Sequence, residues 1–140
     1  NEEFMEHFNR NGRFMRDALE VFDSKKLITF LSDIEVDTHS PDGFRVFPTS
    51  HSSNTIVIAL QKKMQNIGVE LKCNQKVQTL LYENNQIIGL KTSTHTYKCH
   101  NIIIATGGMG FSSLGAEGDG YKLASELGHK TTALFPAMLP

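Results

Sequence analysis

The chain has 140 residues, of which 39% are hydrophobic, and this is enough for one domain with its own core. The formal net charge of −1 argues against the broad basic surface of a nucleic-acid-binding protein. No apolar run approaches the roughly 20 residues of a membrane span, and no signal-peptide pattern opens the sequence, so we expect a cytoplasmic protein without nucleic-acid or membrane partners.

Residues 1–35 are predicted to form three short helices, because apolar residues recur there at helical spacing. Asp23 or Ser24 is a suitable N-cap for the third helix, since either side chain can accept a hydrogen bond from the first turn. We interpret the phenylalanines and methionines of these helices as core side chains and not as a surface that stacks on a cofactor.

Residues 36–74 are predicted to form a hairpin, a helix and a strand. The sequence Ser40-Pro41-Asp42-Gly43 has turn chemistry, and the second strand of the hairpin ends at Pro48. A helix with one apolar stripe then ends at Gly68, and residues 69–71 are expected to form a short parallel strand. The stripe consists of Ile56, Val57, Leu60, Met64 and Ile67.

Residues 75–100 change to a period of two, which predicts a three-stranded antiparallel meander with its first turn at Glu83-Asn84-Asn85. Cys73 and Cys99 have no CxxC spacing, and no histidine cluster shares a helix face, so we expect two buried free thiols and no metal site.

Residues 101–140 are predicted to form a strand, a glycine loop and a helix. Residues 102–105 are apolar and rich in β-branched side chains, as in a parallel strand buried on both faces. Six glycines follow between Gly107 and Gly120, which favours close approach of the backbone to a ligand. An ordinary loop that only ends a strand and starts a helix is the alternative. Asp119 is expected either to cap the helix or to take part in chemistry.

Several of these segments resemble motifs of a known flavoprotein group. Residues 104–108, Ile-Ala-Thr-Gly-Gly, resemble the ATGG motif of two-dinucleotide-binding-domain flavoproteins, and Gly118-Asp119-Gly120-Tyr121 resembles their GDG element. Residues 43–48 are similar to a GRVFP segment, and Gly128-His129 and Phe135-Pro136-Ala137 also have counterparts. As a set, the motifs are similar to those of the HI0933-like bacterial flavoproteins, also called YhiN or BaiN-like, over nearly all of the chain.

The resemblance implies an α/β fold: a partial FAD-binding fold with helices, parallel strands and the antiparallel meander. All four segments, 1–35, 36–74, 75–100 and 101–140, would belong to the central part of one FAD-binding domain. The implied FAD-binding residues are Val77, Ala105, Thr106, Gly107, Gly108, Gly118, Asp119 and Gly120. The backbone of Val77 would contact adenine, although a plain strand residue is the alternative. Arg45 and Pro48 are implied to lie on the flavin side. The position of Arg45 on a hairpin, taken alone, favours a solvated side chain instead.

Flavoproteins of this type open with a GxGxxG unit, which this sequence lacks, so we expect a central fragment whose partners include the remainder of the parent chain. The sequence identifies no catalytic acid, base or nucleophile. We expect part of an FAD-dependent oxidoreductase that acts on a small organic substrate, with NAD(P)H as a further expected electron donor. The alternatives are a stand-alone module that binds a phosphorylated ligand, and a degenerate relative that has lost its cofactor.

Overall fold

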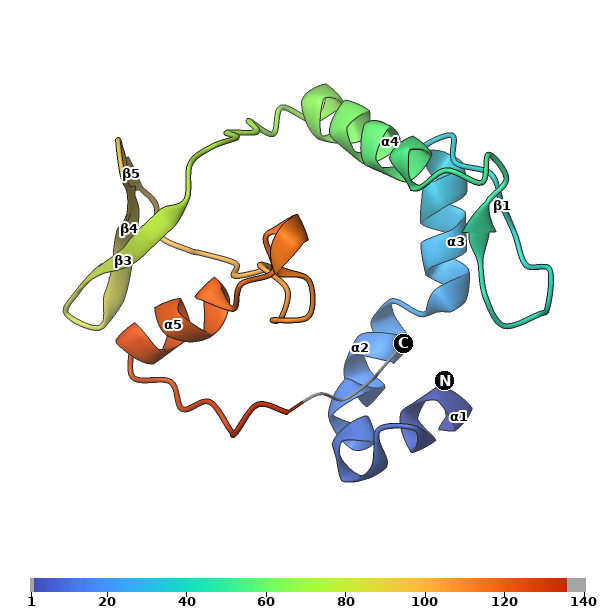
Figure 1. Ribbon diagram of the computed structural model, residues 1–140, viewed down its shortest axis with the longest axis horizontal. Helices are drawn as coiled ribbons and strands as arrows, with labels where there is room; N and C mark the ends of the chain where they lie inside the picture. The colour runs from blue at the N-terminus through green and yellow to red at the C-terminus, as the bar shows by residue number, and fades with distance from the viewer. Residues whose placement is uncertain (1, 136–140) are drawn as a thin grey trace. The chain divides into compact units, whose positions relative to one another are not determined.

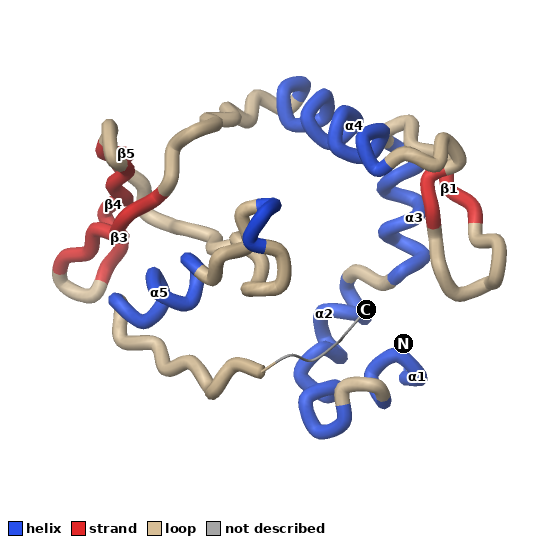
Figure 2. Tube along the Cα trace, viewed as in Figure 1, coloured by secondary structure: helices blue, strands red, loops and turns tan. Residues whose placement is uncertain are grey.

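The computed structural model describes residues 2–135, which fold as two compact units divided between Leu71 and Lys72. Helices and antiparallel strands occur together in the chain, so the predicted mixed α/β class is confirmed (Figures 1 and 2). Pro136 and Ala137 of the segment similar to a family motif lie outside the described residues.

The first unit begins with short helices, as predicted. They are α1 (Glu2–Glu6), the 3₁₀ helix η1 (Asn9–Met15), α2 (Arg16–Val21) and α3 (Ser24–Asp33). Asp23 is the N-cap of α3, and its carboxylate accepts a hydrogen bond from the Lys26 N–H at 2.9 Å. Met5 is buried as expected, but the interpretation as core residues is wrong for four phenylalanines, which are exposed: Phe4, Phe8, Phe14 and Phe22.

The predicted hairpin is present with very short strands, β1 (Thr38–His39) and β2 (Phe47–Pro48), which pair antiparallel. Asp42 organises the connecting loop, because its carboxylate accepts hydrogen bonds from the backbone N–H groups of Phe44 and Arg45 at 3.0 and 2.8 Å. These bonds lower the pKa of Asp42, with the Arg45 backbone bond as the largest cause.

Helix α4 (Ser53–Asn66) follows the hairpin, and Gly68 ends it in the left-handed conformation at φ +79°, as predicted. One other expectation fails here, because residues 69–71 form no strand. That expectation assumed a parallel strand to join, and the described residues of this unit contain none. The apolar stripe on α4 has no fully buried residue.

The second unit contains the predicted meander of β3 (Val77–Glu83), β4 (Gln86–Thr92) and β5 (Thr96–Lys98), paired antiparallel in that order. Asn84 and Asn85 both have positive φ, which suits the tight turn between β3 and β4. Cys73 is exposed and Cys99 is half-buried, which corrects the expectation of two buried thiols. Cys73 lies in the irregular segment before β3, where no element covers it.

Residues 101–108 form no strand, contrary to prediction, and the side chain of Ile103 is 91% exposed. A parallel strand needs hydrogen-bonding neighbours, and the three strands described in this unit pair only with one another. The 3₁₀ helix η2 (Ser112–Leu114) and helix α5 (Asp119–Glu126) follow, and Gly128 has a left-handed conformation after α5. Helix α5 packs on β3, where Leu123 and Leu80 are both buried.

Candidate functional site

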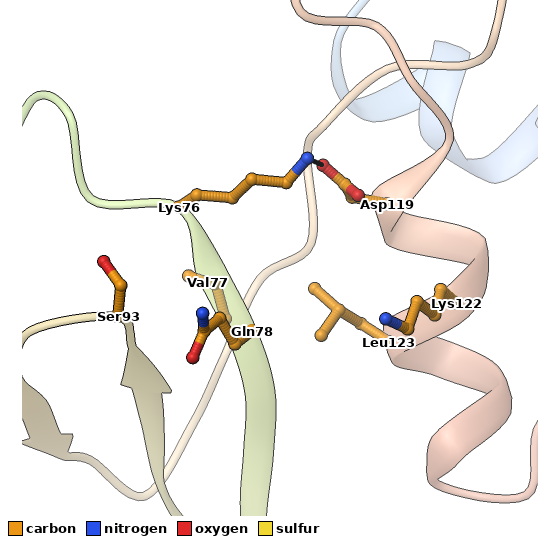
Figure 3. Close-up of a pocket in the computed structure, with 7 residues that line it drawn as sticks. All are labelled: Lys76, Val77, Gln78, Ser93, Asp119, Lys122 and Leu123. Carbon is orange, nitrogen blue, oxygen red and sulfur yellow. Dashed lines mark ion pairs between the residues drawn. The ribbon is translucent and has the colours of Figure 1, made fainter.

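A cavity of about 380 Å³ opens between β3 and α5 (Figure 3). Both sides contribute polar side chains, from the start of β3, from Ser93 after β4 and from α5, and each side also supplies one apolar residue. We call it the β3–α5 cavity. It is lined by Lys76, Val77, Gln78, Ser93, Asp119, Lys122 and Leu123. Because the residues on both sides belong to the second unit, this site is built within one compact body.

Lys76 joins the two sides of this cavity. Figure 3 shows its side chain reaching from the start of β3 to Asp119 at the start of α5. The ammonium nitrogen lies 3.0 Å from Oδ2 of Asp119 and 2.7 Å from Oε2 of Glu117. The hydrogen bond to Glu117, followed by that to Asp119, raises the pKa of Lys76, so the lysine is a cation at neutral pH.

A second, more apolar cavity of about 300 Å³ shares part of this lining and extends toward residues 102–106. Three of the predicted site residues, Val77, Thr106 and Asp119, line it together. The remaining lining residues are Gln75, Lys76, Leu80, Leu90, Ile102, Ile103, Ile104 and Leu123. A polar cavity beside an apolar one, with both containing Val77 and Asp119, suits a ligand that combines a flat apolar ring with hydroxyl or phosphate groups.

The predicted glycines lie beside these cavities and bring backbone segments close together. A Cβ atom at Gly120 would lie 2.5 Å from Oγ1 of Thr106, and one at Gly118 would lie 2.8 Å from Cγ of Met109. Gly118 also has φ +83° and Gly107 has φ +74°, which other residues adopt only with strain. At Gly108, a Cβ would be 3.8 Å from the Tyr121 hydroxyl, an ordinary contact. Ala105 is exposed between two residues that line the apolar cavity.

The interpretation of Asp119 as a helix cap is wrong. Gly118 is the N-cap of α5 and Asp119 is its first residue, and no side chain makes a capping hydrogen bond. The Asp119 carboxylate is instead held by Lys76 at the cavity wall. A carboxylate in this position can accept hydrogen bonds from hydroxyl groups of a ligand.

Arg45 and Pro48 belong to the first unit, so the structure does not place them relative to the cavities. Arg45 binds a carboxylate of its own chain, with Nε 2.6 Å from Oδ2 of Asp42, and its guanidinium lies over the ring of Phe47. Its side chain is nevertheless 72% exposed. Pro48 pairs with Thr38 in the hairpin.

Sequence reasoning missed Lys76 and Glu117, which are 41 residues apart and meet only in the folded unit. A local signal existed for each, because Lys76 directly precedes Val77 and Glu117 lies between two predicted loop glycines. Among residues 2–135, nowhere do three His, Cys, Asp or Glu side chains gather as the ligands of one metal ion would. In the same range, every helix is too short or too polar to cross a lipid bilayer.

Comparison with known proteins shows a family match and several curated relatives. Residues 1–134 match the family model described as "HI0933-like protein Rossmann domain". The chain is also 24% identical, over 95% of its length, to a 3-dehydro-bile acid delta(4,6)-reductase from Clostridium scindens. It is 23% identical, over 87% of its length, to a ribosomal RNA dihydrouridine synthase from Haemophilus influenzae.

A D-amino acid dehydrogenase from Helicobacter pylori is 33% identical over 57% of the chain. The chain spans 32%, 31% and 22% of the lengths of these three curated relatives, in the order given.

Proposed function

The chain belongs to the HI0933-like Rossmann-domain family, and we propose that it forms part of an FAD-dependent oxidoreductase acting on a small organic substrate. The names of the relatives support redox chemistry, since they include a reductase and a dehydrogenase. The observation that carries the proposal is the meeting of Val77, Thr106 and Asp119 around one cavity. Thr106 and Asp119 come from two separate flavoprotein-like motifs, and the family resemblance implies Val77 as an adenine contact.

The residues present fit a dinucleotide. Gly108 leaves open backbone where a side chain would otherwise stand, and the paired cavities offer a polar and an apolar wall. We propose that the backbone of Val77 holds the adenine, that Asp119 accepts hydrogen bonds from sugar-type hydroxyls, and that the backbone around Thr106, Gly107 and Gly108 lies against the cofactor. The other proposed contacts are Ala105, Gly118 and Gly120.

When bound, FAD supplies the electron transfer, and the protein supplies position, charge and exclusion of water. Lys76 holds the Asp119 carboxylate at the cavity wall, where its oxygens can accept hydrogen bonds from the ligand. Leu80, Leu90 and Leu123 make the inner wall apolar and keep water away from a flat ring bound there. As finer proposals, NAD(P)H is the electron donor and Arg45 and Pro48 lie on the flavin side.

The visible absorption spectrum of the complete gene product, as purified, tests this function. We expect the flavin bands, and we expect FAD to restore them after the flavin has been removed. A colourless protein that gains no flavin absorbance on reconstitution contradicts the proposal. Tight binding of inorganic phosphate by such a protein would instead support the phosphate-binding module.

A further inference from the structure

The segment that leads into α5 is a turn with two left-handed glycines. Gly115 has φ +86° and Gly118 has φ +83°, and Ala116 and Glu117 lie between them. Backbone hydrogen bonds link Ala116 to Phe111 at 3.0 Å and Glu117 to Gly115 at 3.0 Å. Glycine adopts this conformation without steric cost, but it also has the largest conformational freedom to lose. Residues 115–118, which we call the 115–118 turn, therefore need outside contacts to hold one conformation.

Apolar packing supplies little of that restraint. The side chains of Phe111 and Leu114, just before the turn, are 68% and 83% exposed. Lys76 provides a stronger contact, because its ammonium group binds the carboxylates of Glu117 and Asp119, the residues on either side of Gly118. One side chain at the start of β3 thus holds both neighbours of Gly118, the residue at which the turn meets α5.

We propose that Lys76 is a positioning residue, which holds the 115–118 turn and Asp119 in the conformation that binds the dinucleotide. The inference rests on the proposed function, and it gives Lys76, which lines both cavities, the role of holding two carboxylates in place. Lys76 directly precedes Val77, the proposed adenine contact. Its two ion pairs, which we call the Lys76 tether, therefore connect the β3 side of the proposed cofactor site to the α5 side.

The exposure of the three side chains separates this role from a general role in folding. Lys76, Glu117 and Asp119 are 62%, 52% and 35% exposed, and exposed ion pairs contribute little to folding stability. We expect these ion pairs to affect FAD affinity more than folding stability. A ligand that meets an already ordered turn does not have to supply the free energy of ordering it. Loss of the tether is therefore expected to weaken FAD binding while the fold stays intact.

The test uses the complete gene product, stripped of flavin and titrated with FAD, with affinity followed by flavin fluorescence. We expect Lys76→Met to weaken FAD binding by about 3- to 10-fold and Lys76→Arg to restore most of it. Glu117→Gln is expected to cause part of the same loss. The double variant Lys76→Met/Glu117→Gln should bind no more weakly than Lys76→Met alone, because both substitutions break the same tether.

Lys98→Met is the matched control, since it removes the same charge from an exposed lysine of β5 outside both cavities. It should leave FAD affinity unchanged. An equal loss in Lys98→Met would show a general effect of charge and would overturn the inference. So would a large fall in the melting temperature of flavin-free Lys76→Met, which would make the tether a requirement of folding.

The two proposals fail in distinguishable ways. If the unaltered protein binds no FAD, the proposed function is wrong. If it binds FAD and Lys76→Met binds it equally tightly, the proposed function stands and the role of Lys76 is wrong.

Discussion

Gly120 lies against Thr106 so closely that a Cβ atom on the glycine would stand 2.5 Å from the threonine hydroxyl oxygen. The same atom would stand 2.9 Å from Cγ2 of Ile104. The first turn of α5 therefore rests directly on residues 104–106, which line the apolar cavity. This contact connects the two glycine-containing motifs, and it favours glycine at position 120 whether or not a ligand also lies there.

Gly120→Ala is expected to destabilise the chain by about 1–2 kcal/mol, because overpacking costs more than the helix propensity of alanine returns. Urea unfolding of the 140-residue chain measures the change. Adding Thr106→Ala should recover part of the loss, since it removes the hydroxyl that the new methyl group would meet. A Gly120→Ala variant as stable as the original chain would show that the contact is not tight in solution.

The proposed contact between FAD and the glycine loop is best tested at Gly108. Gly107 has φ +74°, so any side chain there strains the backbone whether or not a ligand binds. Gly108 and Gly110 are not among the residues with positive φ, and neither would meet a neighbour closer than 3.8 Å. We expect Gly108→Ala to fold normally and to weaken FAD binding about tenfold or more, because its methyl group would occupy the space of the ligand.

Gly110→Ala serves as the comparison in the same loop, and FAD titration of the complete gene product measures both variants. A smaller loss for Gly110→Ala is expected. Equal affinity of Gly108→Ala and the unaltered protein would move the cofactor contact away from Gly108.

The features that sequence reasoning predicted well depend on neighbouring residues. Asp23 caps α3 through a residue three positions on, Gly68 ends α4, and Asn84 and Asn85 form the turn of the meander. The features that it missed depend on distant partners. Lys76 meets Glu117 across 41 positions, and periodicity carries no information about such a pair.

Residues 102–104 show the same limit in another way. Their composition predicts a buried parallel strand, but a strand forms only where another strand offers hydrogen bonds. Composition describes what a segment is suited to, and pairing decides what it forms. The candidate residues Thr106 and Asp119 were found by motif and Val77 by the family resemblance, whereas their common cavity became visible only in the structure.

Hydrogen exchange of the 140-residue chain tests the missing strand. The amides of residues 102–104 should exchange at rates close to those of an unstructured peptide, because no ladder protects them. The amides of β4, which is paired on both sides, should exchange at least about tenfold more slowly. Equal protection of the two segments, measured by NMR, would mean that residues 102–104 find a strand partner in solution.

The last prediction concerns the cap of α3. The backbone hydrogen bond from Lys26 is the main cause that lowers the pKa of Asp23 below its usual value. Since the pKa is lower in the folded state, the cap contributes its full stability above the unfolded pKa of about 4 and loses it as the pH falls through the folded pKa. Asp23→Ala should therefore lower the melting temperature by a few degrees at pH 7, and the difference should narrow near pH 2.

Circular dichroism melts at a series of pH values measure this difference. Asp23→Asn is the control, because asparagine caps a helix about as well as aspartate and does not titrate. Relative to Asp23→Asn, the original chain should lose stability as the pH falls, whereas Asp23→Ala and Asp23→Asn should differ by the same amount at every pH. A constant difference between the original chain and Asp23→Asn would show that the ionised carboxylate adds nothing to the cap.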